Sequence, residues 1–128
     1  MRSLCTCAWA ALFLLGAGCG QKVNVEKSVT LEPGTMLAPI VLDGPKSEQK
    51  INVEFSADNP IDVYVILGKD EKAILAQLES PKKLDIRASK KNSKGDTLAA
   101  TIPAGSDYGV YLANATKKTA VKVSVKTP

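Results

Sequence analysis

Apolar and polar residues alternate along most of the chain after residue 22, and this period of two predicts half-buried β-strands. Lys50–Phe55 alternates without error, and residues 61–67 are apolar on both faces, which is typical of a central strand. Residues 36–42 alternate too, but Pro39 confines them to a sheet edge or a bulge. The same pattern recurs over residues 23–31, 84–88, 98–102, 108–112 and 121–125.

Clusters of turn-forming residues separate these segments. They fall at Pro33–Gly34, Asp43–Pro45, Ala57–Pro60, Lys90–Asp96, Pro103–Asp107 and Asn114–Lys118. The only predicted helix, residues 70–79, has acids in its first turn, an apolar stripe of Ile74, Leu75 and Leu78, and Pro81 to end it. The sequence therefore predicts an all-β domain over residues 23–128, a single antiparallel β-sandwich (jelly-roll or Greek-key-like) with about eight strands and one short helix.

Residues 1–18 have the layout of a secretory signal peptide. Arg2 supplies the positive charge, Ala8–Leu15 the apolar core, and Gly16–Gly18 the small residues that a signal peptidase accepts. The apolar stretch is shorter than the roughly 20 residues that a transmembrane helix needs. A removed signal is therefore favoured over a retained anchor helix.

The residues Leu15-Gly16-Ala17-Gly18-Cys19 resemble the lipobox of bacterial lipoproteins. The resemblance implies that Cys19 becomes the first mature residue, that its thiol carries the lipid, and that residues 19–22 are the lipidated cysteine and a tether. It implies export and membrane anchoring in the cell envelope, periplasmic or surface-facing, with the outer membrane favoured in a Gram-negative organism because Gly20 follows the cysteine. Ordinary cleavage near Gly18 or Gly20, leaving Cys19 a plain thiol, is the alternative.

Composition narrows the classes of site that the chain can carry. Its 128 residues include 17 Lys+Arg, 13 Asp+Glu and no His, so the commonest general base and metal ligand is missing. The basic residues are spread between apolar ones, which argues against a nucleic-acid partner. The cysteines are Cys5, Cys7 and Cys19, so a chain processed at Cys19 forms no internal disulfide. We expect neither enzymatic activity nor a cofactor.

Two further stretches, residues 55–66 and 102–114, resemble hairpins of bacterial pre-peptidase C-terminal domains. The second is also similar to the closing hairpin of GOLD-like (Golgi-dynamics) sandwiches. The resemblance spans roughly residues 48–126. It implies a β-sandwich accessory module that binds or packs rather than catalyses, and it bears on the fold more than on the function.

Two constellations carry candidate chemistry. Asp58, Asn59 and Asp62 place three oxygen-bearing side chains around one predicted turn, but calcium needs six to eight oxygen ligands, so turn chemistry is favoured over a metal site. Ser80-Pro81-Lys82-Lys83 matches the S-x-x-K motif of serine acyl-enzymes. That chemistry needs the serine at the start of a long helix in a cleft, whereas Pro81 here ends a helix.

Two surfaces are candidates for binding. Lys82, Lys83, Lys90, Lys91 and Lys94 form a basic group that would contact anionic lipid headgroups or cell-wall polymers, against the alternative of a solvated loop. Tyr64 and Tyr111 would form an exposed ligand platform if their strands pair, although packing on a sheet face is the favoured interpretation.

These observations together predict a lipid-anchored lipoprotein of the cell envelope that acts as a non-enzymatic binding or structural module. Its expected partners are the membrane, through the lipid on Cys19, and an envelope protein or anionic polymer. Two alternatives belong to other classes: an accessory subunit that presents substrate to an envelope enzyme, and a small hydrolase that uses Ser80 and Lys83.

Overall fold

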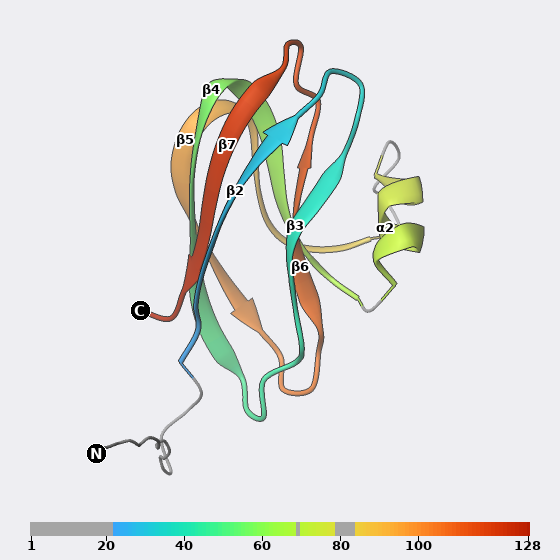
Figure 1. Cartoon of the computed structure of the whole chain (residues 1–128). Coiled ribbons are helices and arrows are strands. Elements are labelled where there is room, and N and C mark those ends of the chain that lie inside the picture. Colours follow the sequence, from blue (N-terminus) through green and yellow to red (C-terminus); the bar gives the residue numbers. More distant parts are fainter. Residues whose placement is uncertain (1–21, 69, 79–83) are drawn as a thin grey trace, which may run out of the picture.

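The computed structural model describes residues 22–68, 70–78 and 84–128, in which all the strands join one antiparallel sheet (Figure 1). The expected signal peptide and Cys19 lie outside these residues. The elements are β2 (Asn24–Leu31), β3 (Leu37–Leu42), β4 (Gln49–Leu67), α2 (Glu71–Gln77), β5 (Asp85–Ile102), β6 (Tyr108–Ala113) and β7 (Thr119–Lys126). The strand order is β2-β7-β4-β6-β3, and β5 pairs with β4. The described chain is thus mostly antiparallel β-structure with one short helix.

Within the described residues, the eight predicted strand segments lie in strands apart from the first residue of three of them, and the expected number of about eight strands is corrected to six. Residues 50–55 and 61–67 belong to one 19-residue strand, β4, and residues 84–88 and 98–102 belong to the 18-residue strand β5. The expected turns at Ala57–Pro60 and Lys90–Asp96 are therefore not chain reversals. The other predicted turns do connect separate strands.

Those two groups of turn-forming residues make bulges where β4 changes partner. Up to Ala57, β4 pairs with β7, and from Asp62 onward it pairs with β6. The register between β4 and β5 shifts between Ser56 and Ile61, a stretch that contains Pro60, which has no N–H to donate to a ladder. The bulge bends both strands without ending them, since β5 follows β4 on either side of it.

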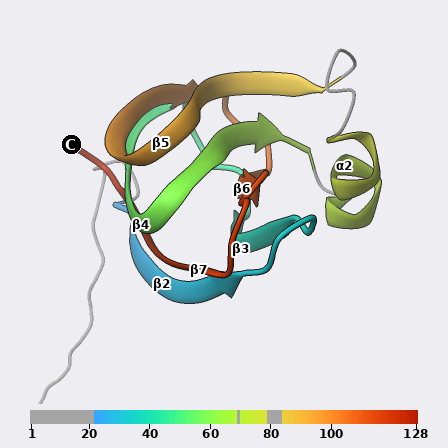
Figure 2. The same ribbon diagram turned by 90° about the horizontal axis from the view of Figure 1, so that it is seen from above.

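Because the sheet bends, one of its faces encloses the main core (Figure 2). The two parts of β4 contribute to that core with the same alternation that the sequence shows, for example through Val53 and Val65, which are fully buried. The core is completed by Leu31, Ile40, Ile51, Phe55, Ile61, Val63, Leu98, Ala100, Ile102, Tyr108, Val110, Leu112, Ala115, Val121, Val123 and Val125.

A second, smaller core lies on the other face of β4 and β6, where α2 covers the sheet (Figures 1 and 2). Asp70 caps the helix, since its Oδ1 accepts a hydrogen bond from the Ala73 N–H at 3.1 Å. The predicted stripe packs as expected: Ile74 and Leu78 are buried and Leu75 is partly buried. This cover explains why residues 61–67 are apolar on both faces, and it confirms their central place between β5 and β6.

The two ends of the described chain meet at one end of the sheet (Figure 1). The Thr127 N–H donates to the Val23 carbonyl at 3.0 Å, and the Val23 N–H donates to Thr127 Oγ1 at 3.4 Å. β3, which contains Pro39, is an edge strand with a register shift between Leu37 and Ile40, as the proline predicts. No helix within the described residues is long and apolar enough to cross a membrane.

Candidate functional site

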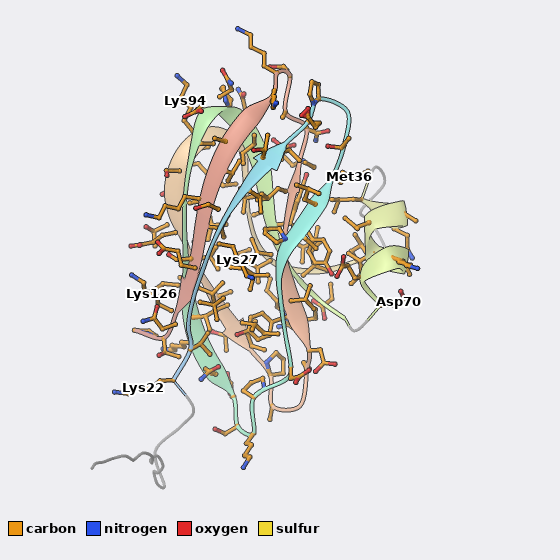
Figure 3. All side chains as sticks on the ribbon, in the orientation of Figure 1. Lys22, Lys27, Met36, Asp70, Lys94 and Lys126 are labelled. Atoms are coloured by element: carbon orange, nitrogen blue, oxygen red, sulfur yellow. The ribbon has the colours of Figure 1, made fainter. Side chains whose placement is uncertain are left out.

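A cavity of about 350 Å³ opens beside the second core. Four parts of the fold meet there: the turn between β2 and β3, the middle of β4 and β5, the end of α2, and the end of β6. It is lined by Gly34, Thr35, Met36, Asp62, Tyr64, Leu78, Lys91, Ala113 and Asn114. Met36 lies toward the end of the molecule that is remote from Lys22 (Figure 3).

Asp62 organises the polar side of this cavity. Its Oδ1 accepts a hydrogen bond from the Asn92 N–H at 2.8 Å, and its Oδ2 accepts one from Asn114 Nδ2 at 2.6 Å. Asn92 and Asn114 are the only described residues other than glycine with a positive φ, 52° and 63°. Left-handed backbone is costly for most side chains but is tolerated by Asn, so one carboxylate holds two asparagines in this conformation.

The floor of the cavity is apolar and belongs to the second core. Met36, Leu78 and Ala113 contribute side chains there, and Tyr64 contributes its nearly buried ring. Tyr64 lies directly opposite Tyr111 in the pairing of β4 with β6, so the two rings share a face as the sequence suggested. Their relative exposures are only 4% and 0%, so the favoured interpretation of packing is confirmed and the alternative of an exposed platform is wrong.

The three buried phenols have raised pKa values. Burial, together with the neighbouring Asp62 carboxylate, raises the pKa of Tyr64. Burial also raises the pKa of Tyr108 and of Tyr111, with Glu71 and Asp70 adding to the effect at Tyr111. Within the described residues, the hydroxyls of Tyr108 and Tyr111 are buried without a hydrogen-bond partner.

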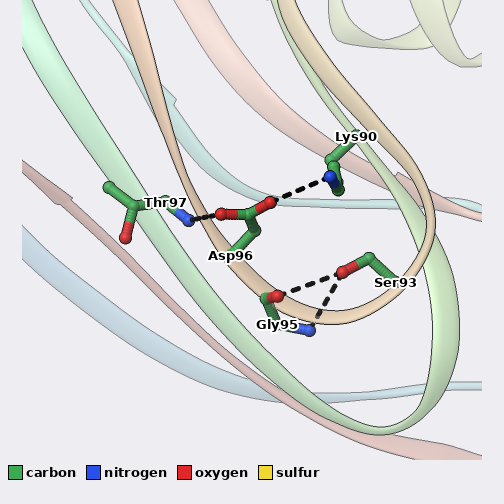
Figure 4. Close-up of polar contacts among 5 residues, drawn as sticks. All are labelled: Lys90, Ser93, Gly95, Asp96 and Thr97. Atoms are coloured by element: carbon green, nitrogen blue, oxygen red, sulfur yellow. Dashed lines mark hydrogen bonds and ion pairs between the residues drawn. The ribbon is translucent and has the colours of Figure 1, made fainter.

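The predicted lysine group falls partly on the bulge of β5. Lys90 forms an ion pair with Asp96 at 3.1 Å (Figure 4). Two neighbours hold the pKa of Asp96 below its usual range. The hydrogen bond from the Thr97 N–H is the largest single cause, and the hydrogen bond and charge of Lys90 add to it. Lys91 lines the cavity and Lys94 is exposed near the bend (Figure 3). Lys82 and Lys83 lie outside the described residues.

Asp58, Asn59 and Asp62 have different neighbours although they are close in sequence. Asn59 Nδ2 donates to Thr119 Oγ1 at 3.3 Å, which ties the bulge to the start of β7. Asp62 bonds to Asn92 and Asn114 as above, and Asp58 lines a shallow depression with residues such as Ser28 and Lys122. Over residues 22–68, 70–78 and 84–128, no three His, Cys, Asp or Glu side chains gather as metal ligands would.

Two other depressions lie on the polar outer face of β2, β7 and β4, with volumes of about 530 and 420 Å³. Both are more open to solvent than the cavity at Asp62, and short Ser, Thr and Ala side chains make up much of their lining. Small ligands bind mainly in enclosed sites where a few polar groups converge. The cavity at Asp62 is therefore the better candidate.

Sequence reasoning found Asp62, Tyr64 and Lys91 but did not place them together, and it did not single out Asn92, Met36 or Leu78 as site residues. The asparagines gave one usable signal, because Asn in a turn cluster often adopts a left-handed backbone. Ser80 and Lys83, the pair of the hydrolase alternative, lie outside the described residues.

The arrangement is suited to holding a small molecule, since it joins an apolar floor to a fixed carboxylate and a lysine. No family model matches this chain, and no curated protein matches it.

Proposed function

We propose that this chain is a lipid-anchored lipoprotein of the cell envelope that acts as a non-enzymatic binding module. Lipid on Cys19 would hold it to the membrane, and the cavity at Asp62 would take the ligand. We also propose that the bent sheet forms the two layers of an antiparallel β-sandwich, with β4 and β5 passing through both layers.

The observation that carries the proposal is the position of the cavity relative to the anchor. Only three residues separate Cys19 from Val23, whose backbone is bonded to Thr127 at one end of the sheet. The cavity lies toward the other end, where Met36 is found (Figure 3). A body tethered so closely would direct the cavity away from the anchoring membrane.

The position of the lysine group relative to the anchor limits what it can contact. Lys94 lies at the end remote from Lys22 (Figure 3), so headgroups of the anchoring membrane would be out of reach. Three carboxylates, Asp58, Asp62 and Asp96, lie on the same bend and offset the charge of Lys90, Lys91 and Lys94. An anionic envelope polymer is the remaining partner for this surface, and a binding cavity is the better-supported site.

Intact mass of the protein from the membrane fraction tests the anchoring, with Cys19→Ser as the comparison. We expect the wild-type mass to show loss of residues 1–18 and gain of acyl chains, since a lipid thioether requires the Cys19 thiol. A mature chain without lipid would contradict the membrane part of the proposal and leave an exported soluble domain.

Photo-crosslinking in living cells tests whether the cavity binds a ligand. A photo-reactive amino acid replaces Thr35, on the cavity rim, in one variant, and Lys50, at the start of β4 near the other end of the sheet, in a second variant. We expect a discrete crosslinked product from position 35 only. Equal products from both positions, or none from either, would count against the cavity as a binding site.

A further inference from the structure

We infer that the cavity at Asp62 selects ligands that carry a carboxylate next to a small apolar group, with Lys91 as the residue that recognises the carboxylate. This inference rests on the proposed binding function and names the class of ligand for the same site.

Hydrogen bonding in the cavity, rather than its net charge, favours an anionic ligand. The lining has one acid and one base, Asp62 and Lys91, so the charges of these two side chains balance. Two donors already bond to the Asp62 carboxylate: the Asn92 N–H and Asn114 Nδ2. Lys91 forms no ion pair with any carboxylate of the described residues, whereas neighbouring Lys90 is paired with Asp96. The ammonium group of Lys91 is thus the charged group left to meet a ligand.

The remaining lining limits the size and polarity of that ligand. Met36, Leu78, Ala113 and the edge of Tyr64 form an apolar floor that would pack against a short aliphatic chain. A volume of about 350 Å³ is at the lower end of the range for small-molecule sites. A single branched aliphatic acid, or the last residue of a peptide with a free C-terminal carboxylate, has the matching chemistry.

Titration of the purified full chain in detergent, followed by NMR shifts of the Ala113 and Asn114 amides, tests this. The probes are N-acetyl-leucine, its uncharged amide and 4-methylpentanoate. Ligands of this size bind with dissociation constants of millimolar order, so the titration extends to tens of millimolar. We expect N-acetyl-leucine to bind about tenfold more tightly than its amide, since an ammonium–carboxylate hydrogen bond is worth at least that factor. Binding of 4-methylpentanoate as tight as that of N-acetyl-leucine would identify a free aliphatic acid, and weaker binding a peptide terminus.

Lys91→Gln is the decisive variant and Lys94→Gln the matched control, because Lys94 is also exposed but does not line the cavity. Lys91→Gln should weaken binding of the acid about tenfold and leave that of the amide unchanged, while Lys94→Gln changes neither. Equal binding of acid and amide, an unaffected Lys91→Gln variant, or no saturable shift would each overturn the inference. The mass measurement on Cys19 does not depend on any of these results.

Discussion

At the scale of single residues, the hydrogen bonding of two side chains differs from what their burial suggests. Asp62 is only partly buried, yet it joins β4 to the bulge of β5 and to the end of β6. Tyr111 is fully buried, yet its hydroxyl has no partner among the described residues. The two cases give opposite expectations for substitution, because a lost hydrogen bond and a lost unsatisfied group act in opposite directions.

Asp62→Ala is expected to lower the free energy of unfolding by about 1–3 kcal/mol. Its loss leaves Asn92 and Asn114 in left-handed backbone without the carboxylate that holds them. Urea denaturation measures the effect. Asp58→Ala is the control, with an expected change within about 0.5 kcal/mol, because Asp58 is exposed and forms no ion pair within the described residues. Equal effects of the two substitutions would show that the hydrogen bonds of Asp62 contribute nothing.

Tyr111→Phe is expected to stabilise the protein by about 1 kcal/mol, because it removes a buried hydroxyl that has no partner. Tyr64→Phe is the control, with an expected change within about 0.5 kcal/mol, because the Tyr64 hydroxyl is not among the buried groups that lack a partner. Thermal and urea unfolding of the two variants at neutral pH measure both effects. Destabilisation by Tyr111→Phe would mean that its hydroxyl has a partner in solution, such as an ordered water.

The same substitution should change the response to alkaline pH. The pKa of Tyr111 is raised in the folded state from the ordinary 10.0, so the folded chain keeps a proton that the unfolded chain releases. Stability from this source is complete below about pH 10 and is lost as pH rises above it. The free energy of unfolding of Tyr111→Phe should therefore fall less steeply between about pH 9 and 11 than that of the wild type.

At the scale of elements, the edges of the sheet need protection from pairing with other molecules. β2 and β3 end the strand order, and each pairs with one neighbour only. On β2, Lys27 lies opposite Val123, so it shares the inner face with Val25 and Val29 while remaining exposed at the edge (Figure 3). An inward-facing charge on an edge strand disfavours addition of another strand.

Lys27→Val is therefore expected to promote self-association of the chain through the β2 edge. Light scattering coupled to size-exclusion chromatography measures the mass of the particles at increasing protein concentration. Lys122→Val is the control, because Lys122 lies on the outer face of an interior strand and pairs with Glu26 at 3.4 Å. If both variants stay monomeric, or both associate equally, the protective role of Lys27 is wrong.

At the scale of the whole molecule, β4 and β5 run through both parts of the sheet. β4 pairs with β7 before its bulge and with β6 after it, while β5 runs beside both parts. We therefore expect the described chain to unfold as one cooperative unit, with a change in one part of the sheet affecting the other through the continuous strands. Separate hairpins, as the predicted turns implied, would not provide this continuity.

Val53→Ala tests this coupling, since Val53 is fully buried and lies opposite Val125 in β7. We expect a loss of about 1–3 kcal/mol, and an equal fall in hydrogen-exchange protection at Val123 and at Val110, which β4 contacts beyond its bulge. Val41→Ala, at the exposed edge, should leave both amides unchanged. A fall confined to Val123 would show that the two parts of the sheet open independently.

Local sequence determined the strand segments, their buried faces, the helix and the edge position of β3, because side-chain periodicity and proline chemistry act over a few residues. Tertiary structure decided that Ala57–Pro60 is a bulge and not a turn, since pairing with β7, β6 and β5 can carry a strand through residues that locally favour reversal. Tertiary structure also determined which residues line the cavity. Met36, Asp62, Leu78, Lys91 and Asn114 are separated by 13 to 26 residues from one to the next, and only burial of two cores on opposite faces of one sheet brings them together.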